Sequence, residues 1–183
     1  MEITAQIIGI VAIIVSILSM TFKSKKMIML LCTIYNIMTL TSYVFLGKYL
    51  GSILVGILTL KSFIYYIYAL KKAKPNLVVL IMLEIAILTM SIVLWQFWFD
   101  IFILLSSLIN TYFSWQDNVK ILKISVVITS VLLVLYDIFA GAYVYVISEI
   151  LYGGTALISL LFVKRGTKDN EQNVNTGERE KNL

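Results

Sequence analysis

Seven apolar runs, each close to the length that crosses a lipid bilayer as a helix, follow one another along this 183-residue chain. They cover Ile3–Phe22, Met27–Leu46, Leu50–Leu70, Leu77–Trp95, Trp98–Trp115, Val119–Phe139 and Tyr143–Val163. Charged residues make up only 14% of the chain, against about 25% in soluble domains. The runs are long and continuous, not short and alternating, which excludes an outer-membrane barrel. The sequence therefore predicts an all-α polytopic membrane protein with seven transmembrane helices within residues 1–165.

Basic residues are distributed unevenly among the segments between the runs. Every second loop, together with the tail, is rich in them: Lys23, Lys25, Lys26, Lys71, Lys72, Lys74, Lys120, Lys123, Lys164, Arg165 and Lys168. The other loops hold only Lys48. Because cytoplasmic loops carry the excess of lysine and arginine, we expect the rich set inside the cell. The amino terminus is then outside, and the polar tail, residues 166–183, is a disordered cytoplasmic segment.

The chain also contains a faint internal repeat with an offset of 94 residues. Of the 24 positions from Lys26 to Tyr49, 5 are identical to the position 94 residues later. This offset lays the first three runs on the last three and leaves the fourth as a linker. We therefore expect two parallel three-helix repeats, residues 3–71 and 98–163, joined by a linker helix at residues 77–95. Transporters built from parallel repeats bind solute between the halves.

Three stretches carry a resemblance to a known family: LYDIFAGAYVYVISEILYGG (Leu135–Gly154), SYVFLGKYLGSILVGILTLK (Ser42–Lys61) and QIIGIVAIIVSILS (Gln6–Ser19). They resemble the YgjV-type bacterial inner-membrane proteins over residues 3–165. The resemblance implies a multi-pass protein of the bacterial inner (plasma) membrane with the 3+1+3 fold of SWEET, PQ-loop and PnuC proteins. It implies no particular reaction.

This chain departs from that family pattern at two positions. The family usually has arginine where this chain has Lys61, and asparagine where it has Asp137. The proline hinges and proline-glutamine motif of the sugar carriers are also missing from the runs.

Lys61 stands at the middle of the run Leu50–Leu70, where a charge costs about 2.5–3.5 kcal/mol on insertion scales. Such a side chain should face a bundle interior or a wet cavity and have a partner. Two interpretations stay open. Lys61 is half of a structural ion pair or reaches toward the membrane surface, or it lines a pathway for a solute or ion.

Four acidic residues lie within the runs: Glu84, Asp100, Asp137 and Glu149. Asp100 and Asp137 lie near the outer ends of their runs, where interfacial water can solvate them. Glu149 is deeper, about 10 Å from the outer end, and Lys61 is about 16 Å deep on the same scale. An unpaired charge is costly at either depth, so we expect Lys61 and Glu149 to be coupled, directly or through one water.

Polar uncharged residues gather on one side of several runs, which mostly indicates close helix packing. Asn36 and Asn110 are exceptions, because an amide has four hydrogen-bonding sites and rarely satisfies all of them at a helix contact. One asparagine per half forms a candidate solute-binding pair. Aromatic candidates for the same path are Tyr65, Tyr145 and Tyr152.

No catalytic triad, metal-ligand cluster or phosphate loop is present, and the chain has no histidine and a single cysteine. We therefore expect no enzyme activity, cofactor, metal or nucleic acid, although Asp100 with Asp137 keeps an intramembrane aspartate pair open. The expected partners are the lipid bilayer and a small solute, with homo-oligomer formation left open. The first interpretation is a small-solute transporter or transporter-like protein. The alternative is a sensor or assembly partner whose charges only specify helix pairing.

Overall fold

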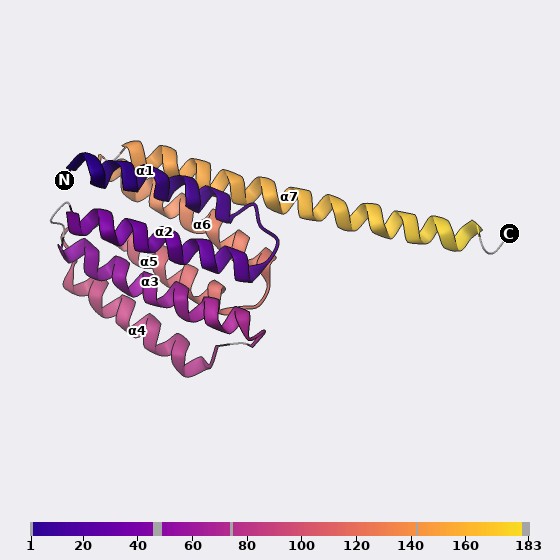
Figure 1. Ribbon diagram of the computed structural model, residues 1–183, viewed down its shortest axis with the longest axis horizontal. Helices are drawn as coiled ribbons and strands as arrows, with labels where there is room; N and C mark the ends of the chain where they lie inside the picture. Colours follow the sequence, from indigo (N-terminus) through magenta and orange to yellow (C-terminus); the bar gives the residue numbers. More distant parts are fainter. Residues whose placement is uncertain (1, 46–48, 74, 142, 181–183) are drawn as a thin grey trace.

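The computed structural model describes residues 2–45, 49–73, 75–141 and 143–180, with side chains described no further than residue 162. Within these residues the chain folds into helices alone, which confirms the predicted all-α class (Figure 1). The helices are α1 (Glu2–Ser19), α2 (Lys25–Phe45), α3 (Tyr49–Leu70), α4 (Leu77–Val93), α5 (Asp100–Trp115), α6 (Val119–Phe139) and α7 (Tyr143–Glu180). Each predicted run coincides with one helix to within a few residues, except that α7 continues past the seventh run.

Four helical segments of the described chain are long and apolar enough to cross a membrane: Lys25–Phe45, Ser52–Leu70, Val119–Phe139 and Tyr145–Phe162. The segments Ile7–Ser19 and Leu77–Val93 are apolar but shorter. The protein is thus a polytopic helical membrane protein. The disorder predicted for residues 166–183 stays a prediction, because the side chains there lie outside the described ones.

Asparagine caps set where two of the helices begin. The Asn76 side-chain oxygen accepts a 3.2 Å hydrogen bond from the backbone N–H of Val78 at the start of α4. Asn118 accepts a 2.9 Å bond from the Lys120 N–H at the start of α6. Asparagine is among the favoured N-cap residues because its short side chain satisfies an orphan N–H. These caps end two of the lysine-rich loops.

The helices pack as two halves with related contacts. In the first half α2 packs against both α1 and α3, and in the second half α6 packs against both α5 and α7. Between the halves, α1 contacts α7 and α3 contacts α5. If α1, α2 and α3 correspond to α5, α6 and α7, then the contact of α1 with α7 corresponds to the contact of α5 with α3. The contacts of the two sets of helices thus correspond, and α4 packs beside α3 and α5. The division into two repeats stays a prediction.

Successive helices run in opposite directions, so that the connections lie at two ends of the bundle (Figure 1). One end carries the loops α1–α2, α3–α4 and α5–α6, which are the lysine-rich loops. This end is called the lysine end below. The turns α4–α5 and α6–α7 lie at the other end.

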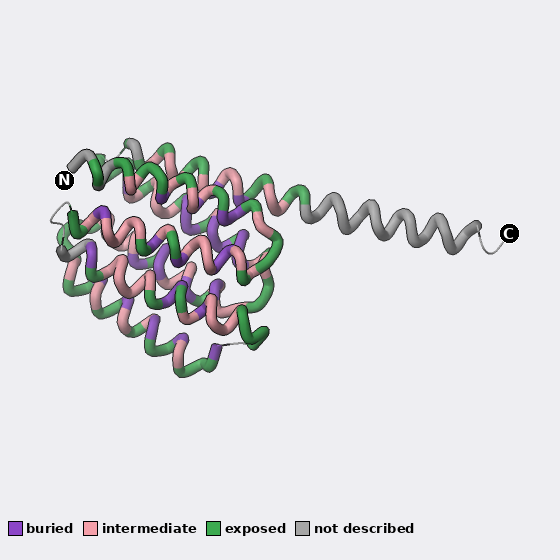
Figure 2. Tube along the Cα trace, in the orientation of Figure 1, coloured by how far each residue is buried: buried purple, intermediate pink, exposed green. Residues whose placement is uncertain are grey.

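Figure 2 shows which positions of the bundle are exposed and which are buried. Many of the exposed side chains are large and apolar, whereas many of the buried ones are polar. Large apolar side chains are exposed along α1, α4 and α7, among them Ile14, Met82 and Ile147. Serine and threonine are common among the buried side chains, and Ser19 and Thr111 are fully enclosed. A soluble domain does not expose so much contiguous apolar surface, whereas lipid tails cover it without cost.

Candidate functional site

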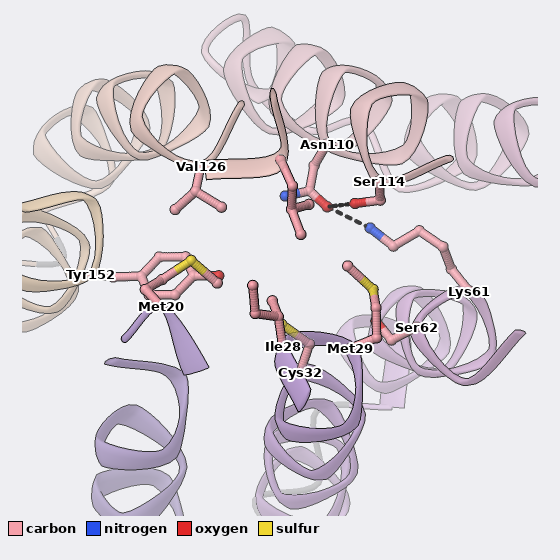
Figure 3. A pocket seen from close by; sticks show the side chains of 11 residues that line it. Met20, Ile28, Met29, Cys32, Lys61, Ser62, Asn110, Ser114, Val126 and Tyr152 are labelled. Carbon is pink, nitrogen blue, oxygen red and sulfur yellow. Dashed lines mark hydrogen bonds between the residues drawn. The ribbon is translucent and has the colours of Figure 1, made fainter. Parts of the chain in front are cut away.

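A small cavity lies between the two halves (Figure 3). Its wall is formed by α2, α3, α5, α6 and α7, and by the residue that directly follows α1. The lining residues are Met20, Ile28, Met29, Cys32, Lys61, Ser62, Asn110, Ser114, Leu122, Val126 and Tyr152. The cavity volume is about 20 Å³, which is room for about one water molecule. Most of the wall is apolar, and α3 and α5 supply most of its polar groups.

Lys61 is the one charged residue in this wall, and its side chain is only 5% exposed. Its ammonium donates a 2.8 Å hydrogen bond to Oδ1 of Asn110, which also accepts a 3.3 Å bond from the Ser114 hydroxyl. Lys61 belongs to α3 and Asn110 to α5, so this contact joins the two halves across the cavity (Figure 3). The prediction that Lys61 faces the bundle interior and has a polar partner is confirmed.

The direct pairing expected between Lys61 and Glu149 is not found among the described side chains, and coupling through one water stays a prediction. Glu149 Oε2 accepts a 3.0 Å hydrogen bond from the Ser130 hydroxyl, which links α7 to α6 within the second half. Among the described side chains, Lys61 has no carboxylate oxygen within 4.0 Å. Depth along a helix placed the two residues at similar levels, but the rotation of α3 and α7 about their axes directs the side chains to different neighbours.

The two candidate asparagines have different surroundings. Asn110 lines the cavity, whereas Asn36 lies behind it and donates through Nδ2 to the Ser62 hydroxyl at 2.9 Å and to the Leu58 carbonyl at 3.4 Å. These bonds hold α2 against α3 within the first half. Asn36 therefore reaches the cavity only through Ser62, which is in the wall.

The three candidate tyrosines lie in different surroundings. Tyr152 lines the cavity from α7. Tyr65 is fully buried, and its hydroxyl donates a 3.3 Å bond to the Thr111 carbonyl, which fixes α3 to α5. Tyr145 lies near the start of α7 with its side chain exposed. The structure brings only Tyr152 of this group to the cavity.

The other acidic candidates lie away from the cavity wall. The Asp100 carboxylate accepts hydrogen bonds from the backbone N–H groups of Gln96 and Phe97, at 2.7 and 2.8 Å, and so holds the α4–α5 turn. Asp137 is buried near the end of α6. Glu84 of α4 is partly buried, and its charge and that of Lys61 act on each other through space.

The buried hydroxyl groups mostly bond to their own helices. Ser16, Thr33 and Thr111, for example, each donate to the carbonyl three or four residues earlier. A hydroxyl satisfied in this way needs no solute, and its small side chain lets a neighbouring helix approach closely. These small polar side chains are compatible with the expected close helix packing, but the bonds of these hydroxyls are within one helix and not between helices.

Lys123 was counted with the loop lysines, yet its side chain is almost completely buried within α6. Its ammonium donates a hydrogen bond to the Ser159 hydroxyl of α7. Its position one turn inside the sixth run was the sequence feature that could have indicated this burial. Lys123 does not line the cavity, so Lys61 and Lys123 are two buried lysines in different surroundings.

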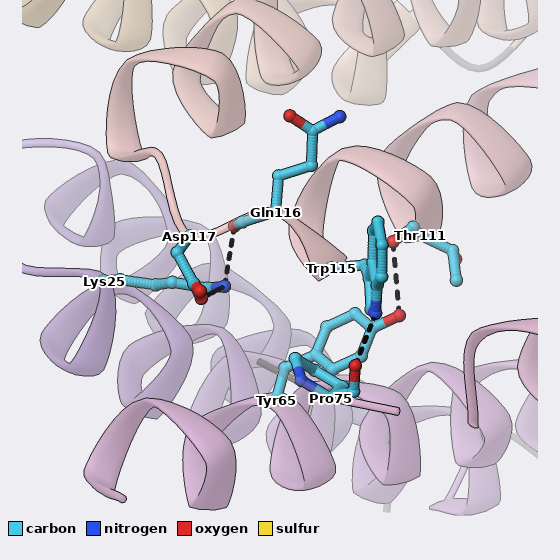
Figure 4. Close-up of polar contacts among 7 residues, drawn as sticks. All are labelled: Lys25, Tyr65, Pro75, Thr111, Trp115, Gln116 and Asp117. Atoms are coloured by element: carbon cyan, nitrogen blue, oxygen red, sulfur yellow. Dashed lines mark hydrogen bonds and ion pairs between the residues drawn. The ribbon is translucent and has the colours of Figure 1, made fainter. Parts of the chain in front are cut away.

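At the lysine end of the bundle, hydrogen bonds and an ion pair join segments that are far apart in the sequence (Figure 4). The Lys25 ammonium, at the start of α2, donates to the Gln116 carbonyl at 2.7 Å and pairs with Asp117 at 3.0 Å. Nearby, the Trp115 indole N–H donates a 2.8 Å bond to the Pro75 carbonyl and ties α5 to the α3–α4 loop. These bonds involve residues of, or directly beside, the lysine-rich loops.

The chemistry offered by the cavity is that of a binding site. Lys61, Ser62, Asn110 and Tyr152 carry groups that can form hydrogen bonds with a small polar group, and the rest of the lining is mostly apolar. Among the described residues, no group of three histidine, cysteine or acidic side chains is arranged to hold a metal ion.

Comparison of the chain with curated proteins gives no match, and comparison with solved structures gives none either. The family model described as a bacterial inner membrane protein, Imp-YgjV, matches residues 3–165. This match covers nearly all of the chain, including every residue of the cavity wall. The chain therefore belongs to the Imp-YgjV family of bacterial inner membrane proteins.

Proposed function

We propose that the protein is a small-solute transporter or transporter-like protein with seven transmembrane helices and a central polar path between two three-helix halves. The hydrogen bond between Lys61 and Asn110 carries this proposal, because it places a buried ammonium and an amide from opposite halves at one cavity. Parallel-repeat transporters bind solute at the corresponding interface. The corresponding contacts of the two sets of helices support a 3+1+3 fold of the SWEET, PQ-loop and PnuC type.

The residues of the proposed path differ in whether they line the cavity or lie outside its wall. Lys61, Asn110 and Tyr152 contact the solute at the cavity. Asn36 acts one step away, through Ser62, and Glu149 lies in the second half, bonded to Ser130 and outside the cavity wall. The proposal assigns catalysis to none of these residues.

The cavity is small in this conformation. A volume of about 20 Å³ compares with roughly 300–1,000 Å³ for a pocket that encloses a drug-sized ligand. Entry of a solute larger than water therefore requires the halves to move apart. The interhalf bonds at the lysine end are the contacts that such a movement must break.

The proposed orientation has the amino terminus outside and the lysine end in the cytoplasm, supported by the lysine distribution. Single cysteines replacing Lys48 and Lys72, in a Cys32→Ser background, test it. An impermeant maleimide added to intact cells should label the first and not the second. Labelling of both from one side would refute the seven-span topology.

The alternative is a non-transporting sensor or assembly partner. Two observations favour it: most buried hydroxyls are satisfied within their own helices, and the cavity has room for about one water molecule. In that case Lys61 and Asn110 only specify how α3 and α5 pair.

Cys32 provides a direct test, because the single cysteine of the chain lies in the cavity wall. Vesicles of both orientations are treated with a small impermeant thiol reagent, and Cys32→Ser serves as the blank. A transporter exposes the cavity to each side in turn, so Cys32 should react in both vesicle types, and a solute that stabilises the purified protein against heat should change the rate. Reaction from one side only, or only after unfolding, would reject the transporter.

A further inference from the structure

The cavity wall presents hydrogen-bond donors without matching acceptors. The Lys61 ammonium has three N–H groups, and one of them is used on Asn110. The Asn110 oxygen accepts from both Lys61 and Ser114, so its two lone pairs are occupied, while its NH₂ group has no described partner. The Ser62 oxygen accepts from Asn36, which leaves the hydroxyl hydrogen without a described acceptor. The cavity therefore still offers mainly N–H and O–H donors, beside the hydroxyl oxygens of Ser62, Ser114 and Tyr152.

The same wall carries an uncompensated positive charge. Among the described residues, no carboxylate lies within 4.0 Å of Lys61, and Glu149 is engaged by Ser130. Glu84 acts on Lys61 only through space. A buried ammonium without a contacting counter-charge costs several kcal/mol, and an anion in the cavity would offset that cost.

The size and lining of the cavity restrict the anion. A volume of about 20 Å³ is close to one water molecule, so in this conformation the cavity suits a monatomic ion better than a polyatomic solute. The remaining wall is apolar, with Ile28, Leu122 and Val126 among its residues, so a doubly charged and strongly hydrated ion would lose too much solvation. A cation or a neutral acceptor-poor solute would leave the free donors unsatisfied.

We propose that the cavity between the two halves is a binding site for a small monovalent anion of halide size, held by Lys61, the Asn110 NH₂ group and the Ser62 hydroxyl. This inference rests on the proposed function, because it names the ligand class of the same central path. Asn36 is a positioning residue here: it occupies the Ser62 oxygen and so turns the hydroxyl hydrogen toward the cavity.

The first experiment measures heat unfolding of the purified full chain in detergent, at constant sodium concentration, while methanesulfonate is replaced by chloride or bromide. A saturable rise in Tm is expected with both halides, because binding to the folded state raises its stability. Formate and acetate form a second arm. Stabilisation by these carboxylates without stabilisation by halides would overturn the halide assignment, and so would the absence of any halide effect.

Three variants locate the site. Lys61→Met should abolish the chloride dependence of Tm, whereas Lys123→Met, at the other buried lysine, should retain it. Asn110→Asp supplies a built-in counter-charge to Lys61, so it should raise Tm in methanesulfonate and lose the chloride response. If Lys61→Met does not fold, the Asn110→Asp and Lys123→Met results decide. A chloride response that survives Asn110→Asp would overturn the proposal.

A transport measurement separates this inference from the proposed function. Chloride flux is followed in proteoliposomes that contain the wild-type chain. If halides stabilise the protein through Lys61 but no flux of chloride is measured, the result supports the anion site and counts against the transporter. Flux of another solute without halide stabilisation supports the transporter and overturns the anion site.

Discussion

The Lys61 ammonium and the Asn110 side-chain oxygen lie 2.8 Å apart and join α3 of the first half to α5 of the second. Both residues line the cavity, and Lys61 is almost fully buried. A hydrogen bond to a buried charge contributes about 1.5–3 kcal/mol. This contact is therefore strong enough to influence both how the halves associate and how readily they separate.

A double-mutant cycle tests that contact. Asn110→Leu should destabilise the protein more when Lys61 is present than in the Lys61→Met background, with a coupling free energy of about 1.5–3 kcal/mol. The free energy of unfolding in detergent is the measurement. Lys61→Met combined with Glu149→Gln is the control, and these two losses should add. Coupling of Lys61 to Glu149 instead of Asn110 would contradict the observed arrangement.

Two neighbouring glycines of α7 form a natural comparison. A Cβ atom at Gly153 would lie 2.8 Å from the Ser130 Cβ, whereas nothing lies within 4 Å of a Cβ at Gly154. Gly153→Ala should therefore push α6 and α7 apart and cost about 1–3 kcal/mol, while Gly154→Ala should be neutral or slightly stabilising. Thermal unfolding of both variants gives the difference.

The cause of the expected loss at Gly153 can be checked with a second change. Ser130→Gly removes the Cβ that clashes, so it should recover part of the stability of Gly153→Ala despite the lost hydrogen bond to Glu149. Equal effects of the two alanine substitutions would show that α6 and α7 do not approach closely at this point.

The residues Lys72 and Gly141, which follow α3 and α6, both have a positive φ, so exchanging lysine for glycine and glycine for alanine should have opposite effects on stability. Lys72 has a φ of 52°, and the N–H groups of Lys72 and Ala73 bond back to Ala69 and Tyr68, as in a Schellman motif. Glycine adopts this left-handed conformation without strain, so Lys72→Gly should stabilise the fold by about 1 kcal/mol.

Gly141 follows α6 with a φ of 70°, and a Cβ there would meet no neighbour within 4 Å. Gly141→Ala should therefore destabilise by about 1 kcal/mol through backbone strain alone. Lys71→Gly is the control for the loop at α3, since φ is not positive there, and it should bring no gain. A loss of stability in Lys72→Gly would show that the lysine side chain matters more than its backbone.

The helices and their order could be predicted from the sequence, because an apolar run of membrane length has one regular way to satisfy its backbone. The repeat in the sequence stays a prediction, with which the contacts of α1 with α7 and of α3 with α5 are compatible. The lysine-rich loops gather at one end for the same reason: successive helices alternate in direction.

The partners of the buried polar residues could not be predicted in the same way. Sequence position gives the depth of Lys61 and Glu149 but not the rotation of their helices, and rotation decides which side chain each one meets. Asn36 and Asn110 show the same limit, since one packs α2 on α3 and the other faces the cavity. Lys123 was misplaced because a residue one turn inside a helix has the same sequence surroundings whether it points into the bundle or toward the membrane surface.

The ion pair between Lys25 and Asp117 is expected to control access to the cavity from the lysine end. Asp117 is 51% exposed, so the pair should contribute at most about 1 kcal/mol to stability, and Asp117→Asn should lower Tm only slightly. If the pair is broken when the halves separate, the same change should raise the open fraction up to about fivefold. The native Cys32 reports that opening through its rate of alkylation from the lysine end. Lys26→Met removes a charge from the same turn of α2 at an exposed position, and it should leave the rate unchanged. An equal acceleration by Asp117→Asn and Lys26→Met would mean that loop charge, and not this contact between the halves, governs entry to the cavity.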